Sequence, residues 1–161
     1  MINQLNKNSA LALLAVRLAV GWLMFYAGIT KVLAPSWSAA GYLTHAKTFA
    51  GFYAWLAQPG ILPVTNFINE WGLTLLGVSL IFGIGVRFSS VLGAALMMMY
   101  YFPANSFPFV EHGFLVDEHV IYASVLIFFA AIKAGRYYGL ESWCENLPVC
   151  RNYKGLHKFW G

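Results

Sequence analysis

Four long apolar stretches dominate the chain, and polar segments separate them. A helix needs about 20 mostly apolar residues to cross the hydrocarbon core of a bilayer. The fourth stretch reaches that length only if Asp117, Glu118 and His119 are counted in, and the third extends irregularly through residues 103–109. The pattern predicts an all-α fold, an antiparallel bundle of four transmembrane helices. The stretches are Ala10–Val32, Phe67–Val86, Phe88–Phe102 and Phe114–Ala134.

The segment Ala34–Asn66, between the first two stretches, is long and rich in aromatic residues. Within it we expect Gly41–Ala57 to form a short amphipathic helix on the outer membrane surface. Aromatic residues gather at membrane interfaces, so this loop is either an interfacial anchor or a lid over a site. Farther along, Gly83-Ile84-Gly85 and Arg87 predict a tight turn, which makes the second and third helices antiparallel neighbours.

Composition supports lipid as the main solvent of this chain. Of its 161 residues, 60% are hydrophobic and 10% are charged, whereas about a quarter of a soluble domain is charged. The net charge of +4 comes without a basic run, so no nucleic-acid partner is predicted. The first apolar stretch is too long for a signal-peptide core and is expected to be retained.

Basic residues predict the orientation in the membrane. If four helices span, most lysines and arginines fall on the side of both termini. Because basic residues stay on the cytoplasmic side, we expect both termini in the cytoplasm of a prokaryotic plasma membrane. The basic residues on this side are Lys7, Arg87, Lys133, Arg136, Arg151, Lys154 and Lys158.

The chain divides into a membrane domain over residues 1–145 and a short polar, basic cytoplasmic tail over residues 146–161. Cys144 and Cys150 belong to the predicted cytoplasmic end, where thiols are normally reduced. Their spacing matches no strong zinc or redox signature. They either share no role or form a redox pair or a metal contact with His157.

Ionisable residues inside the apolar stretches are the candidates for function, because a charge in hydrocarbon is costly. In the first stretch, Arg17, Gly21, Met24, Gly28 and Lys31 recur at helical spacing and form one stripe. Small residues let membrane helices approach closely, so this stripe is expected to be a buried, packed face. The alternative is that its two cations extend to the membrane interfaces.

The second and fourth stretches bring acids and a histidine to the depth of Lys31, just below the outer surface. The candidate catalytic residues are Glu70, Asp117, Glu118 and His119, and the candidate ligand-binding residues are Lys31, Tyr122 and Arg17. Arg17 does not fit this pocket, because its expected offset from Glu70 along the membrane normal is about 15 Å. We expect Arg17 to find its partner in Glu141 instead. A purely structural network that holds the helices in register is the alternative to a binding site.

Such a pocket suits proton exchange and hydrogen bonding. A histidine among carboxylates can exchange protons near neutral pH and hydrogen-bond the carbonyl groups of a quinone. Lys31 could instead hold a small anion. A larger set of potential metal ligands lacks the HExxH-type spacing, so no metal site is predicted. That set is Glu111, His112, Asp117, Glu118 and His119.

Over about residues 10–145 the chain resembles the DoxX/DoxD family of small membrane proteins. The resemblance depends on the order and spacing of several motifs taken together, and Glu141 departs mildly from it, because the family usually has aspartate there. The motifs are Arg17-Leu-Ala-Val-Gly-Trp-Leu-Met-Phe-Tyr-Ala-Gly-Ile-Thr-Lys31, Glu70 with Gly77, Asp117-Glu-His119-Val-Ile-Tyr122-Ala, and Ala134-Gly-Arg136-Tyr-Tyr-Gly139-Leu140-Glu141.

The resemblance implies a four-helix integral membrane protein. DoxD members are described as a subunit of thiosulfate:quinone oxidoreductase, which needs a second subunit, and other DoxX members are linked to redox-stress complexes. We therefore expect an integral membrane subunit of a quinone-linked redox complex, with quinone as cofactor and no haem, flavin or iron–sulfur site. The alternatives are a non-enzymatic accessory or anchoring protein and a small anion or proton transporter. Whether the chain is itself an enzyme, and whether it forms a homodimer, stay open.

Overall fold

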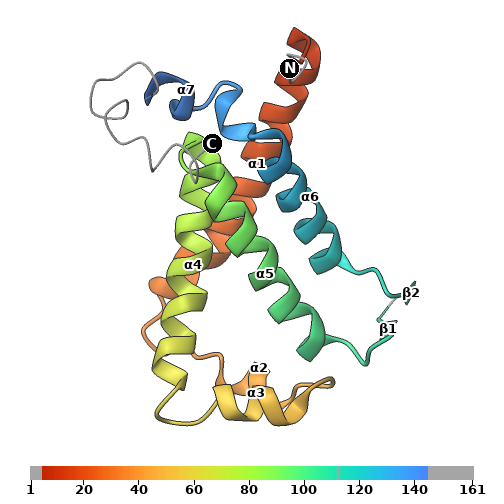
Figure 1. Cartoon of the computed structure of the whole chain (residues 1–161). Helices are drawn as coiled ribbons and strands as arrows, with labels where there is room; N and C mark the ends of the chain where they lie inside the picture. The colour runs from red at the N-terminus through yellow and green to blue at the C-terminus, as the bar shows by residue number, and fades with distance from the viewer. Residues whose placement is uncertain (1–4, 112, 145–161) are drawn as a thin grey trace.

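The computed structural model describes residues 5–111 and 113–144, and for Trp143 and Cys144 it describes the backbone alone. The predicted tail, with Cys150 and His157, and also His112 lie outside the described residues. The fold is mostly helical, as predicted, with one added two-stranded hairpin (Figure 1). The elements are α1 (Lys7–Val32), α2 (Ala40–Thr44), α3 (Ala50–Leu56), α4 (Leu62–Phe82), α5 (Val86–Ala104), β1 (Phe109–Val110), β2 (Gly113–Phe114), α6 (Glu118–Ile132), η1 (Ala134–Arg136) and α7 (Leu140–Cys144).

The long helices form two close pairs, α1 with α4 and α5 with α6. The buried face of α1 carries Arg17, Gly21, Met24 and Gly28 of the predicted stripe, and Lys31 at its end is partly exposed. A Cβ atom on Gly28 would overlap the backbone of Thr74, and one on Gly77 would overlap the backbone of Phe25. These two glycines therefore allow the α1 and α4 backbones to lie in direct contact.

A tight turn joins α4 to α5, as predicted. Gly83 ends α4 with a φ of 67°, and Gly85 precedes α5 with a φ of 61°. Glycine adopts this left-handed backbone without steric cost. From the turn the two helices diverge, and α2 and α3 lie across the far end of the bundle (Figure 1). This divergence leaves room for a site between the long helices and the α2–α3 segment.

The loop between α1 and α4 differs from its prediction. Instead of one helix over Gly41–Ala57, it forms α2 and α3, separated by residues 45–49. Hydrogen bonds to the end of α5 stabilise this break between α2 and α3. The backbone N–H of Lys47 donates to the carbonyl of Pro103 at 3.1 Å, and the Thr48 hydroxyl donates to the carbonyl of Asn105 at 2.6 Å. These tertiary bonds replace the hydrogen bonds that a continuous helix would make.

The fourth helix begins at the Asp117-Glu118-His119 triplet, as predicted, and is shorter than the apolar stretch Phe114–Ala134. Phe114 belongs to β2, and α6 begins at Glu118. Asp117 precedes the helix in an extended conformation, and its Oδ1 accepts from the N–H groups of His119 and Val120 at 3.0 and 3.1 Å. A capping aspartate starts a helix by satisfying its first free donors, which explains the later boundary.

The core of the bundle is apolar and continuous. Leu80, Leu126 and Phe129 are fully buried within it, and a smaller cluster around Tyr53 joins α2 and α3 to the bundle. Of the described helices, α1 is the one that is both long and apolar enough to cross a membrane by length and composition. Helix α6 is apolar but shorter.

Candidate functional site

A cavity of about 500 Å³ lies between the long helices and the α2–α3 segment. Its walls are mostly apolar and aromatic. Its polar groups include Lys31 of α1, Asn69 of α4, Tyr100 of α5 and His119 of α6. Small-molecule sites are typically clefts of about 300–1,000 Å³ with a few polar groups in apolar walls. The cavity is therefore the candidate site of this protein.

Helices α2 and α3 cover the cavity because α5 offers them hydrogen-bond acceptors. Pro103 lies within α5 and has no N–H, so the carbonyl of Met99, four residues earlier, lacks its helical donor. The hydroxyl of Tyr53 donates to this carbonyl at 3.1 Å. The hydroxyl of Tyr42 donates to the carbonyl of Tyr100 at 2.7 Å. Of the two predicted roles for this loop, the geometry is that of a lid.

One wall of the cavity carries a directed row of polar groups. The ammonium of Lys31 donates to the hydroxyl of Tyr100 at 3.3 Å, and this hydroxyl donates to Oδ1 of Asn69. Asn69 in turn donates to the carbonyl of Thr65 at 3.2 Å. Lys31 Nζ also lies 5.1 Å from the ring centre of Trp37 and 5.3 Å from that of Tyr100. The row fixes both the phenol and the ammonium at the cavity wall.

A carboxylate orients the histidine. Nδ1 of His119 lies 2.9 Å from Oδ2 of Asp117, and the side-chain nitrogen of Asn105 donates to the same oxygen at 2.7 Å. A carboxylate only accepts, so Nδ1 carries the proton and Nε2 is the nitrogen that exchanges protons. The imidazole ring lies 6.0 Å from the ring of Tyr100. The pair thus presents an oriented proton-exchanging group beside the polar row.

Asp117 and Tyr42, which lie outside the long helices, have shifted pKa values. Burial alone would raise the pKa of Asp117, but hydrogen bonds from His119, from the backbone of Val120 and from Asn105 outweigh it and hold this pKa below its ordinary value. Burial, with the neighbouring acidic groups, raises the pKa of Tyr42 to about 12. Tyr42 therefore stays a neutral hydrogen-bond donor at physiological pH.

The predicted site residues come together only in part. Lys31 and His119 line the same cavity. Glu70 acts on Lys31 through its charge but does not line the cavity. The side chain of Glu118 is 68% exposed, with an oxygen 4.0 Å from Nδ1 of His119. Tyr122 packs partly buried against the helical core. The functional roles of all five stay predictions.

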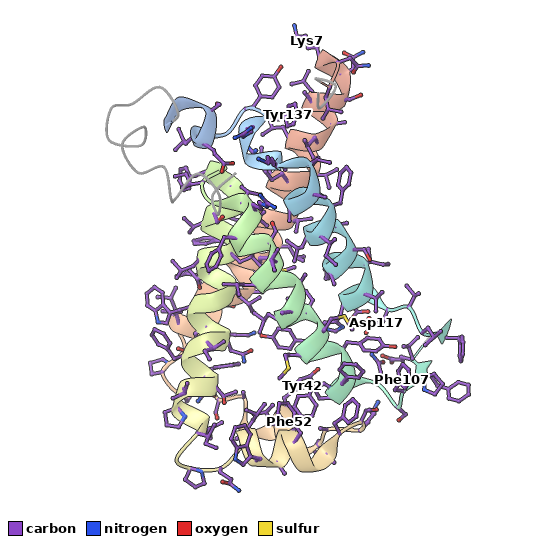
Figure 2. All side chains as sticks on the ribbon, in the orientation of Figure 1. Lys7, Tyr42, Phe52, Phe107, Asp117 and Tyr137 are labelled. Atoms are coloured by element: carbon purple, nitrogen blue, oxygen red, sulfur yellow. The ribbon has the colours of Figure 1, made fainter. Side chains whose placement is uncertain are left out.

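Arg17 lies away from the cavity, as its depth predicted. Its guanidinium is buried and donates to the backbone carbonyls of Ala134 and Tyr137 at 2.6 and 2.9 Å. Glu141 is also buried and acts on Arg17 through its charge, in agreement with the predicted partnership. Figure 2 shows Tyr137 at the end of the bundle opposite Asp117. The contacts of Arg17 fasten η1 to α1, so its ligand-binding role finds no support in this geometry.

The Asp117-Glu118-His119 triplet gathers ligand atoms within 4.8 Å of one another. Both oxygens of Asp117 already accept hydrogen bonds, from the start of α6 and from His119 and Asn105. The triplet is thus accounted for by helix capping and by the orientation of the imidazole.

A family model described as DoxX matches residues 12–106, which is more than half of the chain. The chain belongs to the DoxX family. No curated protein and no solved structure matches it. Membership confirms the resemblance seen in the sequence and the expectation of a membrane protein.

The DoxX match runs from α1 to the end of α5. It includes Lys31, Asn69 and Tyr100, whereas His119 and Glu141 lie beyond it. The polar row of the cavity therefore belongs to the matched DoxX segment, and the histidine that faces it comes from the rest of this chain.

Sequence reasoning on this DoxX protein missed Tyr100, Asn69, Trp37 and Tyr42. In an apolar helix, a tyrosine near the end resembles an interfacial anchor, and the aromatic loop gave the same impression. The available signal was Pro103, because a proline inside a helix leaves a carbonyl that another group must satisfy. That signal points to the end of α5, where the tyrosines of the lid are bound.

Proposed function

We propose that this DoxX protein is a membrane subunit of a quinone-linked redox complex and that its cavity receives the quinone head group. One observation carries the proposal. A largely apolar cavity, with Trp37, Tyr42 and Tyr53 in its walls, holds the ammonium of Lys31, the phenol of Tyr100 and an imidazole oriented by Asp117. Quinone oxygens accept hydrogen bonds, and the flat ring suits aromatic walls.

Each polar side chain of the site has a separate role in the proposed reduction of the quinone. Reduction of a quinone takes up two electrons and two protons, and the electrons come from a redox-active partner subunit. Lys31 donates a hydrogen bond to one ring oxygen and favours negative charge on it. His119 would take up a proton at Nε2 from solvent and pass it to a quinone oxygen, and a second such cycle would supply the second proton. Asp117, beside Nδ1, stabilises the imidazolium that exists between uptake and transfer. Glu118 is exposed near His119 and connects it to solvent protons.

The proposal includes four membrane-spanning helices. Large apolar side chains face outward on all four long helices, as expected of a surface covered by lipid rather than water. Examples are Leu23 on α1, Leu75 on α4, Val91 on α5 and Phe128 on α6, which are 43, 59, 56 and 53% exposed. We place the end with Lys7, the α4–α5 turn and η1 in the cytoplasm, because basic residues are concentrated there.

This orientation is tested with single cysteines in a chain whose Cys144 and Cys150 are replaced by serine. A membrane-impermeant thiol reagent should label Gln58→Cys, beside α3, in intact cells. It should label Asn8→Cys, at the start of α1, only after the cells are permeabilised. Labelling of both positions from the same side would contradict the proposed single crossing by α1, which separates them.

The function is tested by purifying the protein from native membranes and measuring bound quinone by mass spectrometry. We expect quinone and a redox-active subunit to copurify with the wild-type chain. His119→Gln should keep quinone bound but slow its reduction by about a hundredfold or more, as loss of a general acid does. The exposed His45 offers a control, and His45→Gln should leave the rate unchanged. Absence of quinone from the wild-type preparation would overturn the proposal.

The second candidate is a non-enzymatic accessory or anchoring protein, and the β1–β2 hairpin favours it. Phe107, Phe109, Phe114 and Val116 are 52 to 67% exposed around this hairpin, which projects from the bundle (Figure 1). An exposed apolar projection of this kind suits contact with another membrane protein or with lipid. Copurification of a partner without quinone, lost on Phe109→Ser and Phe114→Ser, would favour this candidate.

Transport of an anion or proton between Lys31 and Arg17 has less support. The apolar core of the bundle includes Leu73, Leu76 and Leu80 of α4, which are at most 3% exposed. An ion would have to cross this apolar core. The described cavity is therefore better suited to a ligand that enters and leaves at one end.

A further inference from the structure

Lys31 places a positive charge in the cavity wall without a negatively charged hydrogen-bond partner in the part of the chain that the structure describes. Its single hydrogen bond among the described residues goes to a neutral phenol, that of Tyr100 at 3.3 Å. An ammonium has three N–H donors, so two remain for a ligand. The rings of Trp37 and Tyr100 lie about the cation at 5.1 and 5.3 Å and hold it at the wall without neutralising it.

The negative charges near Lys31 do not complete an ion pair inside the cavity. Among the described residues, Lys31 forms no ion pair at contact distance, and the carboxylates of Asp117 and Glu118 lie beside His119 instead. Glu70 acts on Lys31 through space and does not line the cavity. The carboxylate of Asp117 is occupied by its hydrogen bonds to α6, His119 and Asn105.

The neighbouring side chains of Tyr100 and Asn69 are neutral and cannot provide the missing negative charge for Lys31. The Tyr100 hydroxyl donates its proton to Oδ1 of Asn69, and the Asn69 amide donates to the carbonyl of Thr65 at 3.2 Å. A cation in mostly apolar walls gains more from a ligand that carries a negative charge than from a neutral one. The cavity thus has a positive pole and little negative charge within it.

We infer that the cavity selects aromatic ligands that carry an anionic ring oxygen, and that this oxygen binds at Lys31. The inference rests on the proposed quinone function and narrows its ligand class. It predicts that ring-hydroxylated quinones, which are ionised at neutral pH, bind better than neutral quinones of the same size. Trp37 and Tyr42 lie in the same cavity lining and provide aromatic contacts for the ring.

Two matched probes test the inference on the purified full-length protein. One is an alkyl hydroxynaphthoquinone, which is an anion at neutral pH, and the other is its methyl ether. Dissociation constants are measured by calorimetry and corrected for partition of each probe into detergent. We expect the anion to bind at least about tenfold more tightly to the wild type, since charge-assisted hydrogen bonds are roughly twice as strong as neutral ones.

Variants assign the preference to Lys31. Lys31→Met should bring the two dissociation constants together, and Lys31→Arg should keep most of the preference. Lys47 is exposed in the loop outside the cavity, so Lys47→Met should leave the ratio unchanged. The comparison of the two probes on the wild type needs no variant and stands even if Lys31→Met does not fold.

The outcomes separate the two proposals. If the wild type binds both probes equally, or if Lys31→Met keeps the preference, the inference is overturned and the quinone function stands. If the wild type binds neither probe, the quinone function fails and the inference fails with it.

Discussion

The carboxylate of Asp117 both caps the start of α6 and orients the imidazole of His119. Oδ1 accepts two backbone N–H groups, and Oδ2 accepts from His119 and Asn105. A residue with four donors around it is held in one rotamer, and so is the histidine that depends on it. At the scale of single residues, the site is therefore organised by a helix cap rather than by an ion pair within a helix.

Because of Asp117, the free energy of unfolding should decrease at acid pH. The pKa of Asp117 is lower in the folded chain than the ordinary 3.8, so its stabilisation is complete above that value. The stabilisation is lost as the pH falls through the folded pKa, because the unfolded state takes up the proton first. Unfolding in detergent, followed by circular dichroism against pH, should show this decline.

Two substitutions separate the charge of Asp117 from its capping bonds. Asp117→Asn keeps an oxygen that caps α6 and should remove this part of the pH dependence. Asp117→Ala also removes the cap and should cost about 1 kcal/mol of unfolding free energy at neutral pH. Equal pH dependence in the wild type and in Asp117→Asn would show that another group is responsible.

At the scale of elements, the lid depends on a proline in a different helix. Pro103 withholds a donor from the carbonyl of Met99, and Tyr53 of α3 supplies it. Lys47 and Thr48 add bonds to the same end of α5. A short helix such as α3 is unstable alone, so these contacts are what keep it across the cavity.

Tyr53 and Pro103 should therefore be energetically coupled. Tyr53→Phe should cost about 1 kcal/mol and speed hydrogen exchange in α3, since it leaves the Met99 carbonyl without a donor. In a Pro103→Ala background, α5 supplies the missing N–H itself, and the same substitution should cost clearly less. Additive effects in this double-mutant cycle would mean that the proline does not create the acceptor.

At the scale of the whole molecule, two tight helix pairs that diverge from a common turn create the cavity. Helix α4 packs closely along α1, because Gly28 and Gly77 have no side chains that would hold the two backbones apart. Helix α5 instead pairs with α6, so the two pairs part toward the lid. The divergence of α4 and α5 is then closed by α2 and α3 (Figure 1).

Glycine contacts should dominate the stability of the bundle. Gly28→Ala puts a methyl group against the backbone of Thr74 and should destabilise the protein by about 1–3 kcal/mol. Gly72 lies on α4 as well, and a Cβ there would meet only Leu96, at 3.7 Å. Gly72→Ala should be neutral or slightly stabilising, because alanine favours helix. Comparable losses for both variants in thermal unfolding would contradict direct backbone contact.

The sequence by itself determined the helical class, the buried stripe on α1 and the separation of Arg17 from Lys31. These follow from hydrophobic periodicity and from the rise of a helix, which act within one element. It also placed Lys31 and His119 at the same end, because antiparallel helices return to the same depth.

Only the tertiary structure decided that Tyr100 lies between Lys31 and Asn69, that Glu70 stays outside the cavity, and that the aromatic loop forms a lid. Each depends on how far α4 and α5 diverge and on which carbonyl the proline leaves free for a distant tyrosine. Hydrophobic periodicity gives the face of a helix but not the rotation and spacing of its neighbours, which are set by close packing between elements.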